Sequence, residues 1–392
     1  MAEMSQDLTP DEAALVATAK RFAAEVVAPN AAVWEAERSY PREALAAACE
    51  AGLGGLRVPR ELGGQGAGFQ AGARIVEVLA AADFGFTFPL IVHNNLAANI
   101  ARNATDEQKA RFLPDMVAGR RVGAFLLTEP GAGSDAAAIT TRATRTDGGW
   151  NIEGRKAWVT SGVAADILSV YLQTDPAAGW RGIACFLVEA DTTGVERGAP
   201  YALIGGHAMG ASDITFRRCA VGEDAHFIPA GKAFKAALGG IDIARANVAM
   251  ACCGMLGTAL DTAVGHMRDR RAFGQTTAEF QGLQWELADA ATELEAARLL
   301  AREAVARFDA GADSALAAAH AKKFATRAAF KGIHACMQAM GAVGARADYP
   351  LARHLAAVKL AEYMDGTTGI QNVVIARRLF AERPAGDGKA AE

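Results

Sequence analysis

The sequence predicts an α+β protein that is mostly helical, with a β domain inserted between two helical parts. Alanine is abundant, whereas aromatic residues make up only 7% of the 392 residues, a composition that favours closely packed helices over an all-β fold. Apolar residues recur at helical spacing before residue 120 and after residue 231, and at a spacing near two between them. These observations predict an N-terminal helical domain (1–120), a middle β domain (121–230) and a C-terminal helical domain (231–392).

Composition and charge narrow the classes of function. The net charge is −4 and no run of lysine or arginine is long, so neither nucleic acid nor an anionic membrane surface is an expected partner. Residues 1–10 lack the basic start and apolar core of a signal peptide, and no apolar stretch is long enough to span a bilayer. The six cysteines include no Cys-x-x-Cys pair, so we expect no metal site. We expect a cytoplasmic protein with these thiols in its core.

The N-terminal domain begins with a helix signal at Thr9–Glu12, which combines a cap, a proline and early acids. Further helices are expected at 71–82 and at 105–118, where Thr105 to Gln108 resembles a capping box, and a glycine-rich loop at 52–68. Between these helices stand His93, Asn94 and Asn95 amid apolar residues. Such a group forms either an internal hydrogen-bond network or the lining of a pocket.

The middle domain should contain strands at 122–127, 139–146, 150–153, 166–173, 183–188 and 214–216. Asp147-Gly148 supplies residues that accept positive φ, so a tight hairpin turn is expected there. The C-terminal domain contains an apolar stripe that consists of Leu283, Leu287, Ala290, Leu294, Ala297, Ala301 and Phe308. The last helix is expected at 369–380, followed by a loose tail from Pro384 to Glu392.

The stretch Phe125–Asp135 ends an apolar strand in a turn that contains Pro130 and two glycines. Such a turn exposes main-chain N–H groups to a ligand, although an ordinary glycine and proline turn is equally compatible with these residues. The stretch closely resembles the signature of the acyl-CoA dehydrogenase family, and three further motifs extend the resemblance over nearly the whole chain. It implies a barrel-like β domain and a C-terminal four-helix bundle. It also implies that Phe125, Leu127, Thr128 and Gly133 line the flavin of FAD, and that Ser134 faces both the cofactor and the CoA ester.

The second motif is the run from Gly154 to Gly162. By itself Trp158 would be assigned to the core, at the start of a strand that Thr160-Ser161-Gly162 turns. The run is similar to the flavin-contacting motif of the family. This similarity implies that Trp158 covers the isoalloxazine ring, that Thr160 hydrogen-bonds its polar edge, and that Ser161 belongs to the same site.

The third motif, Asp269–Gly274, contains a pair of arginines, which suit a pyrophosphate because the guanidinium donates hydrogen bonds in pairs. A solvated basic helix end is the plainer interpretation. The motif resembles a family element that reaches the FAD of a neighbouring subunit, which implies cofactor contacts for Arg270, Phe273 and Gln281. Gln338 and Gly341 resemble its companion element. Shared cofactor sites imply a homo-oligomer, normally a tetramer.

The fourth motif runs from Tyr363 to Gln371 and resembles the family element whose glutamate removes the α-proton of the thioester. Here the acid is Asp365, which is one methylene shorter. A carboxylate in a dry site has a raised pKa and suits this proton transfer. The resemblance implies that the main-chain N–H of Asp365 stabilises the thioester oxygen, that Thr367 contacts the cofactor, and that Gly366, Asp242 and Arg245 lie near the substrate.

The resemblance therefore predicts an FAD-dependent acyl-CoA dehydrogenase that passes electrons to an electron-transfer flavoprotein. Because Asp365 sits back, a cyclic or branched acyl group is the expected substrate, with His93 near its end. The alternatives are a flavin oxidase or monooxygenase on the same scaffold, for example one acting on nitroalkanes, and a silent flavin- or CoA-binding paralogue in which Asp365 only caps the Gly-Thr turn.

Overall fold

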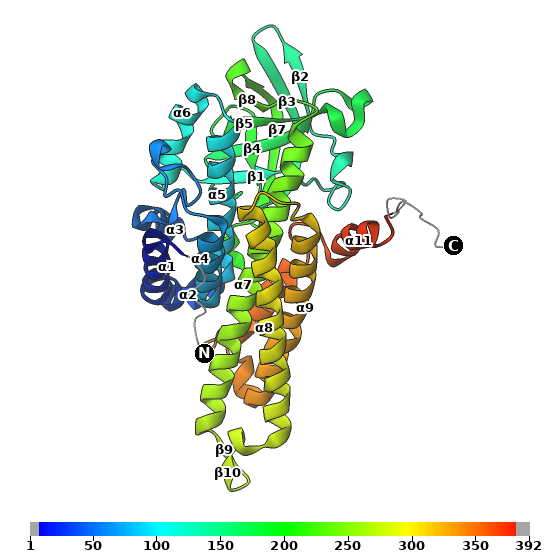
Figure 1. Ribbon diagram of the computed structural model, residues 1–392. Coiled ribbons are helices and arrows are strands. Elements are labelled where there is room, and N and C mark those ends of the chain that lie inside the picture. Colours follow the sequence, from blue (N-terminus) through cyan, green and yellow to red (C-terminus); the bar gives the residue numbers. More distant parts are fainter. Residues whose placement is uncertain (1–7, 382–392) are drawn as a thin grey trace, which may run out of the picture.

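The computed structural model describes residues 8–381, so residues 1–7 and the tail predicted from Pro384 to Glu392 lie outside the described residues. Figure 1 shows an elongated molecule with a sheet at one end, long helices running away from it, and the N-terminal helices packed beside both. The order of helical, strand and helical regions confirms the predicted fold class.

The N-terminal region is helical because its caps and apolar stripes agree. Thr9 and Thr105 each close a capping box, with Glu12 and Gln108 respectively, as the sequence predicts. The helices are α1 (Pro10–Phe22), α2 (Ala28–Glu37), α3 (Arg42–Ala48), α4 (Phe69–Ala82), α5 (Phe84–Asn103) and α6 (Asp106–Val117). The glycine-rich stretch before α4 is a loop with one short 3-10 turn at Arg60–Leu62.

The middle region forms one sheet in the order β6-β7-β3-β2-β4-β5-β8, and β1 pairs in parallel with β4. Its strands are β1 (Gly123–Leu126), β2 (Arg142–Thr146), β3 (Gly149–Val159), β4 (Ile167–Gln173), β5 (Ile183–Glu189), β6 (Val195–Arg197), β7 (Ser212–Val221) and β8 (His226–Ile228). The hairpin between β2 and β3 is confirmed. Its positive φ lies at Gly149 (φ 147°) rather than at Asp147 or Gly148. A Cβ on Gly149 would lie 2.2 Å from the Val221 carbonyl oxygen of β7, so close strand approach requires glycine there.

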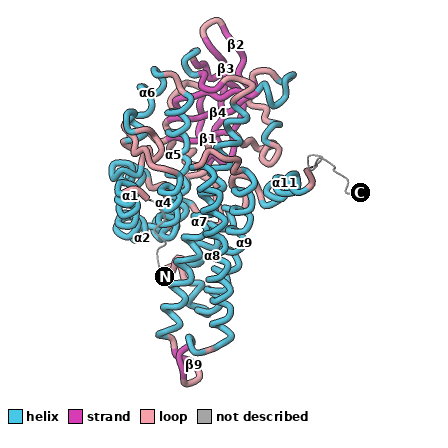
Figure 2. Tube along the Cα trace, in the orientation of Figure 1, coloured by secondary structure: helices cyan, strands magenta, loops and turns pink. Residues whose placement is uncertain are grey.

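The C-terminal region is a bundle of three long helices completed by shorter ones (Figure 2). Its helices are α7 (Ala233–Asp269), α8 (Gln281–Asp309), α9 (Ala315–Met340), α10 (Leu351–Ala361) and α11 (Thr368–Leu379). A small hairpin of β9 (Arg271–Ala272) and β10 (Gln275–Thr276) joins α7 to α8 at the end far from the sheet (Figure 1). The predicted apolar stripe of α8 faces the bundle core.

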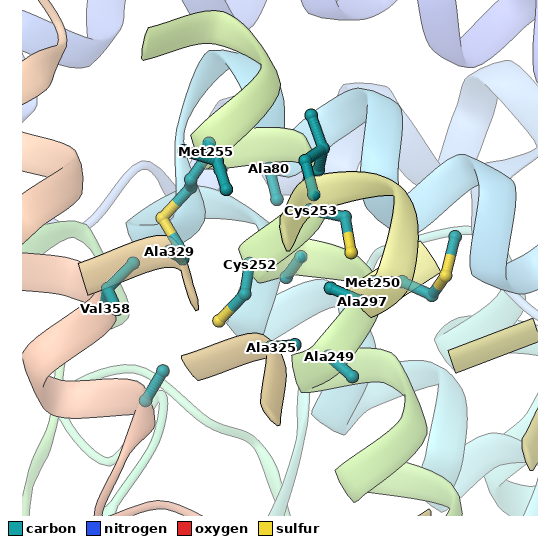
Figure 3. Packing of buried hydrophobic residues seen from close by; sticks show 14 of the residues in the cluster. Ala80, Ala249, Met250, Cys252, Cys253, Met255, Ala297, Ala325, Ala329 and Val358 are labelled. Atoms are coloured by element: carbon teal, nitrogen blue, oxygen red, sulfur yellow. The ribbon is translucent and has the colours of Figure 1, made fainter. Parts of the chain in front are cut away.

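Small side chains let the helices of the bundle approach closely, as the alanine content predicts. Figure 3 shows alanine, methionine and the adjacent Cys252 and Cys253 filling the space between α4, α7, α8, α9 and α10. At Gly254 a Cβ would lie 2.1 Å from the backbone oxygen of Glu77, so α7 touches α4 backbone to backbone. All six cysteines are free and buried, which confirms that they act as core residues.

Helix α7 corrects one expectation from the sequence. It is long and apolar enough, by length and composition, to cross a membrane, with a mean hydropathy of 1.4 in its most apolar window. That window is 67% buried, because α4, α8 and α9 pack around it. The apolar residues of α7 are therefore explained by its place inside the bundle.

Candidate active site

A cavity of about 540 Å³ lies where the helical regions meet the sheet. Its walls come from α5 and the first turns of α7, from Phe125 of β1 and Tyr171 of β4, and from the loop that carries Asp365. Gly239 and Gly240 of α7 leave this space open, because a Cβ on either would meet no atom within 4 Å. Residues far apart in the sequence thus meet around one space that can hold a ligand.

The side chain of Asp365 lies in the turn between α10 and α11. Its backbone is left-handed (φ 50°), a conformation that aspartate tolerates better than most residues. Its Oδ2 atom is buried and has no hydrogen-bond partner in the described part of the chain. Burial raises the pKa of Asp365 to about 6, against the opposing effect of Lys322 and Arg245. The carboxylate is therefore a desolvated base that faces the cavity.

Two buried cations hold the loop around this carboxylate. Arg245 donates from Nε to the Asp365 carbonyl oxygen at 2.9 Å and from Nη1 to Asp242 Oδ1 at 2.6 Å. Lys322 of α9 donates from Nζ to the carbonyl oxygens of Gly366 at 2.7 Å and Glu362 at 3.2 Å. Burial lowers the pKa of the Lys322 ammonium to about 8. These contacts place the predicted residues Asp242, Arg245 and Gly366 around Asp365.

Lys322 was not predicted as a site residue. The available signal was its position, since a lysine occupies a place in the buried alanine stripe of α9, between Ala318 and Ala325. An almost fully buried lysine on a helix stripe needs hydrogen-bond acceptors, and here the loop carbonyls supply them.

The cap of α11 is not Asp365. The Thr367 side chain accepts the N–H of Ile370 at 3.4 Å, whereas Gly366 takes the positive φ of 90° that lets the chain turn. The interpretation of Asp365 as a mere cap of the Gly-Thr turn is therefore wrong, since its side chain is left free for another role.

Trp158 lies on an irregular end of β3, not at the start of a strand. The pairing of β3 with β7 shifts register between Lys156 and Val159, and Trp158 takes a left-handed φ of 59° there. Its ring is 59% exposed, so the assignment to the core is wrong. One side packs on Tyr201, with ring centroids 4.4 Å apart, and the main-chain N–H of Trp158 donates to the Tyr201 hydroxyl at 3.2 Å. Tyr201 was not predicted, because only the fold brings it to this ring.

The turn after β1 is bonded to β3 on one side, and its other side is exposed. Lys156 is fully buried and donates to Glu129 Oε1 at 2.8 Å and to the Leu127 carbonyl oxygen at 2.9 Å. Burial would raise the pKa of Glu129, but the ammonium and the N–H groups of Thr140 and Thr141 lower it to about 2. This ion pair holds the predicted turn against β3.

The exposed side of this turn leaves main-chain atoms accessible to a ligand. Gly133 and Ser134 are exposed, and a Cβ on Gly131 or Gly133 would meet no atom within 4 Å. Thr128, at the start of the turn, is bound to β3 through its carbonyl oxygen, which accepts the Ala157 N–H at 2.9 Å. Leu127 is buried and Thr160 half-buried. The exposed turn and Trp158 together could hold a planar ligand, with the Trp158 ring against one face of that ligand.

Two predicted site residues have structural roles instead. His93 is fully buried and outside the cavity lining. Its Nδ1 accepts the Gly123 N–H at 3.2 Å and its Nε2 bonds the Met116 carbonyl oxygen at 2.9 Å, so it joins α5, α6 and β1. Burial lowers its pKa to about 4, which keeps the ring neutral. Ser161 is also fully buried, and its Oγ accepts the Tyr40 hydroxyl at 3.1 Å.

The remaining predicted residues lie away from the cavity. Arg270, Phe273 and Gln281 stand at the hairpin end of the bundle, and Gln338 and Gly341 at the end of α9. From Arg245 to Arg270 the chain advances about 37 Å along α7. Within one chain these residues cannot share a site with Asp365.

Comparisons with known proteins agree with this geometry. The acyl-CoA dehydrogenase N-terminal, middle and C-terminal domain models match residues 9–120, 124–219 and 231–380. Isobutyryl-CoA dehydrogenase of Dictyostelium discoideum is 32% identical over 96% of this chain and 90% of its own length. Butyryl-CoA dehydrogenase from Megasphaera elsdenii superposes with a TM-score of 0.92 at 31% identity, covering 96% of this chain and all (100%) of that one. A chain from a study of the electron transferring flavoprotein of Acidaminococcus fermentans gives 0.93 at 32% identity, over 97% and 100% of the two chains.

The fold and the site thus define an oxidoreductase of the class that acts on the CH–CH group of acyl-CoA thioesters. The chain belongs to the acyl-CoA dehydrogenase family, whose members depend on FAD.

Proposed function

We propose that this acyl-CoA dehydrogenase uses Asp365 as its base and acts on a cyclic or branched acyl group. The observation that carries the proposal is the buried Oδ2 of Asp365, which faces the cavity without a hydrogen-bond partner in the described part of the chain. A base that is neither paired nor solvated is available for the α-proton of a thioester.

In the proposed reaction, Asp365 takes the α-proton of the acyl group onto its carboxylate. Bound FAD would supply the acceptor for the β-hydrogen and its bonding electron pair, and the loss of both hydrogens would convert a saturated acyl-CoA into the α,β-unsaturated ester. Arg245 and Lys322 bond main-chain carbonyl oxygens of the loop and so fix the backbone from which the carboxylate projects. The main-chain N–H of Asp365 is our proposed donor to the thioester oxygen.

The structure contains features that fit FAD. Trp158 offers an exposed aromatic face, and the turn at Gly131 and Gly133 leaves space where side chains would intrude. We propose that Phe125, Leu127, Thr128, Gly133 and Ser134 would hold the cofactor from β1 and its turn, and Trp158 and Thr160 from β3, with Thr367 on the bundle side. Ser161 supports this set through its bond with Tyr40.

The shape of the cavity and the length of the base support the choice of acyl group. An aspartate carboxylate sits back by about 1.5 Å relative to glutamate, and a misplacement of about 1 Å costs on the order of a hundredfold in rate. A ring or branch at the α-carbon places additional atoms against the cavity wall and shifts the α-carbon toward the shorter carboxylate of Asp365. The open space beside Gly239 and Gly240 accommodates that bulk.

We propose that the protein works as a homo-oligomer, a tetramer by resemblance, in the cytoplasm and with an electron-transfer flavoprotein as electron acceptor. The Phe273 side chain at the β9–β10 hairpin is 96% exposed, and its motif lies far from the cavity of its own chain. A neighbouring subunit would bring Arg270, Phe273, Gln281, Gln338 and Gly341 to a second cofactor site. The six buried free thiols suit a reducing compartment.

The test is an anaerobic titration of the purified yellow protein with straight-chain, branched and cyclohexanecarboxyl-CoA esters. Asp365→Asn should abolish the loss of flavin absorbance, whereas Asp348→Asn, which removes only an exposed partner of Arg346, should leave it intact. Cyclic or branched esters should react fastest. If no thioester bleaches the flavin, the proposal is refuted, and rapid oxygen uptake with a nitroalkane would identify the oxidase instead.

A further inference from the structure

The face of α5 that lines the cavity changes character along its length. Its earlier turns present Phe88, Ile91 and Val92, all apolar. Its later turns still contribute the apolar Leu96 and Ala98, but they add Arg102 and three asparagines. Asn95, Asn99 and Asn103 are each four residues from the last and so lie on one side of the helix. Asn103 Nδ2 donates to Asn99 Oδ1 at 2.6 Å, which satisfies one donor and one acceptor of these amides. A simple alkyl chain lying along these turns would desolvate their remaining polar atoms without replacing the hydrogen bonds to water, which is unfavourable.

An arginine without a counter-ion faces the same region of the cavity. Arg57 is partly buried, donates from Nη2 to Asn95 Oδ1 at 2.6 Å, and lies 4.5 Å from the centre of the Phe69 ring. It forms no ion pair with any of residues 8–381. Asp309 is the nearest carboxylate that affects it, but Asp309 lies beyond ion-pair distance and accepts the N–H groups of Phe69 and Gln70.

A second unpaired group faces this space. Tyr171 is fully buried, lines the cavity, and its hydroxyl has no hydrogen-bond partner in the described part of the chain. The side chains of Cys185, Asn99 and Ser169 lie near the hydroxyl, but none of them meets hydrogen-bond geometry with it. A buried hydroxyl without a hydrogen-bond partner and a guanidinium without a counter-ion face one cavity, which indicates that a ligand supplies acceptor oxygens.

These donors are separate from the catalytic carboxylate. Asp365 lies in the turn between α10 and α11, whereas Arg57 bonds Asn95 of α5 and lies against Phe69 of α4. Both side chains nevertheless line one cavity. A molecule that reaches from Asp365 to Arg57 therefore has a reacting end and a distinct far end.

We propose that the acyl group carries a carboxylate at its far end, and that Arg57, positioned by Asn95, binds this carboxylate with the Tyr171 hydroxyl as a further donor. The substrate class is thus the CoA monothioester of a dicarboxylic acid, and the inference rests on the proposed dehydrogenase function. A guanidinium suits this role because it keeps its charge on burial and donates two parallel hydrogen bonds to a carboxylate.

The first arm of the test compares thioesters that differ only in the far group. The wild-type holoenzyme is given adipoyl-CoA against hexanoyl-CoA, glutaryl-CoA against pentanoyl-CoA, and 4-carboxycyclohexanecarbonyl-CoA against cyclohexanecarboxyl-CoA, and kcat/KM for flavin reduction is measured. At least one carboxylated ester should exceed its partner by about tenfold or more. Equal or better reaction of every uncarboxylated partner would overturn the inference and leave the dehydrogenase function standing.

The second arm assigns the preference to Arg57. Arg57→Met should lose that preference, lowering kcat/KM for the carboxylated ester while sparing its uncarboxylated partner. The matched control is Arg60→Met, three residues away on the same loop, which removes only an exposed pair with Asp11. Retention of the preference in Arg57→Met would overturn the inference. The affinities of the same pairs of thioesters for wild type and for Asn95→Leu are also measured by calorimetry. This measurement tests the carboxylate site even if Arg57→Met does not fold or no thioester is oxidised. Equal affinities within every pair would again overturn the inference.

Discussion

Replacing Lys322 with methionine removes the positive charge nearest to the catalytic loop while keeping a long apolar stem. The Lys322 ammonium acts on the Asp365 carboxylate and lowers its pKa, which stands at about 6 with that charge present. Loss of a nearby opposite charge raises the pKa of a carboxyl by about 1 unit or more. Lys322→Met should therefore move the pKa of Asp365 to about 7, which leaves Arg245 as its remaining buried cation.

The consequence for activity depends on pH in a way that can be calculated. At pH 7 a carboxyl of pKa about 6 is about 90% ionised, and one of pKa about 7 is about 50% ionised. The rate of flavin reduction should fall about twofold at pH 7, about fivefold at pH 6, and hardly at all at pH 9. The base must be ionised to act, so the whole ascending limb of the pH profile moves to higher pH.

Lys322→Met should change the free energy of unfolding only modestly. The Gly366 carbonyl oxygen keeps a second donor, Gln371 Nε2 at 2.8 Å, so only the Glu362 carbonyl loses its buried partner, at a cost of about 1–3 kcal/mol. Removing a buried charge offsets part of that cost. The assay is stopped-flow reduction from pH 5 to 9, with Lys323→Met as control. An unshifted ascending limb in Lys322→Met would refute the electrostatic role.

Three further predictions follow from buried groups. Asp365→Asn should be more stable than wild type at pH 8 by about 1–3 kcal/mol in urea unfolding, because the folded pKa of about 6 lies above the ordinary value and ionisation opposes folding; near pH 4 the gain should vanish. Glu129→Gln should lower the free energy of unfolding by about 3–5 kcal/mol at pH 7, because Lys156 stays buried without its partner. The difference from wild type should shrink as pH falls from about 4.5 toward 2, where the wild-type carboxyl protonates, and an equal loss at pH 3 would contradict this. Gly254→Ala should lower the melting temperature by several degrees, because a Cβ would lie 2.1 Å from the Glu77 backbone oxygen, and an unchanged melting temperature would show that α4 and α7 separate easily.

Features that depend on neighbouring residues in the chain were predictable from the sequence. The capping boxes at Thr9 and Thr105 are local, and the stripe of α8 follows from helical spacing alone. The position of Asp365 in a turn also follows from its own motif. Features set by packing between distant segments were not predictable in this way.

Three residues illustrate this limit. Trp158 is exposed where the pairing of β3 with β7 shifts register, and the residues around Trp158 do not by themselves predict that shift. His93 stands two residues before Asn95 in the sequence, yet the imidazole bonds backbone inside the core and the amide reaches the cavity, since nearby residues of a helix point in different directions. Arg57 stands in a loop and belongs to no motif in the sequence, and only the fold brings it to Asn95.

The backbone contact at Gly254 has a consequence for which residues of this chain can be exchanged. Because α7 rests directly on the main chain of α4 there, the position of its axis is fixed by backbone atoms as long as residue 254 is glycine. The same helix reaches the cavity about three to four turns earlier, where Gly239, Gly240 and Ile243 form the wall. Residues of the wall can therefore be exchanged on a fixed support, and a new acyl group is accommodated without re-aligning the base.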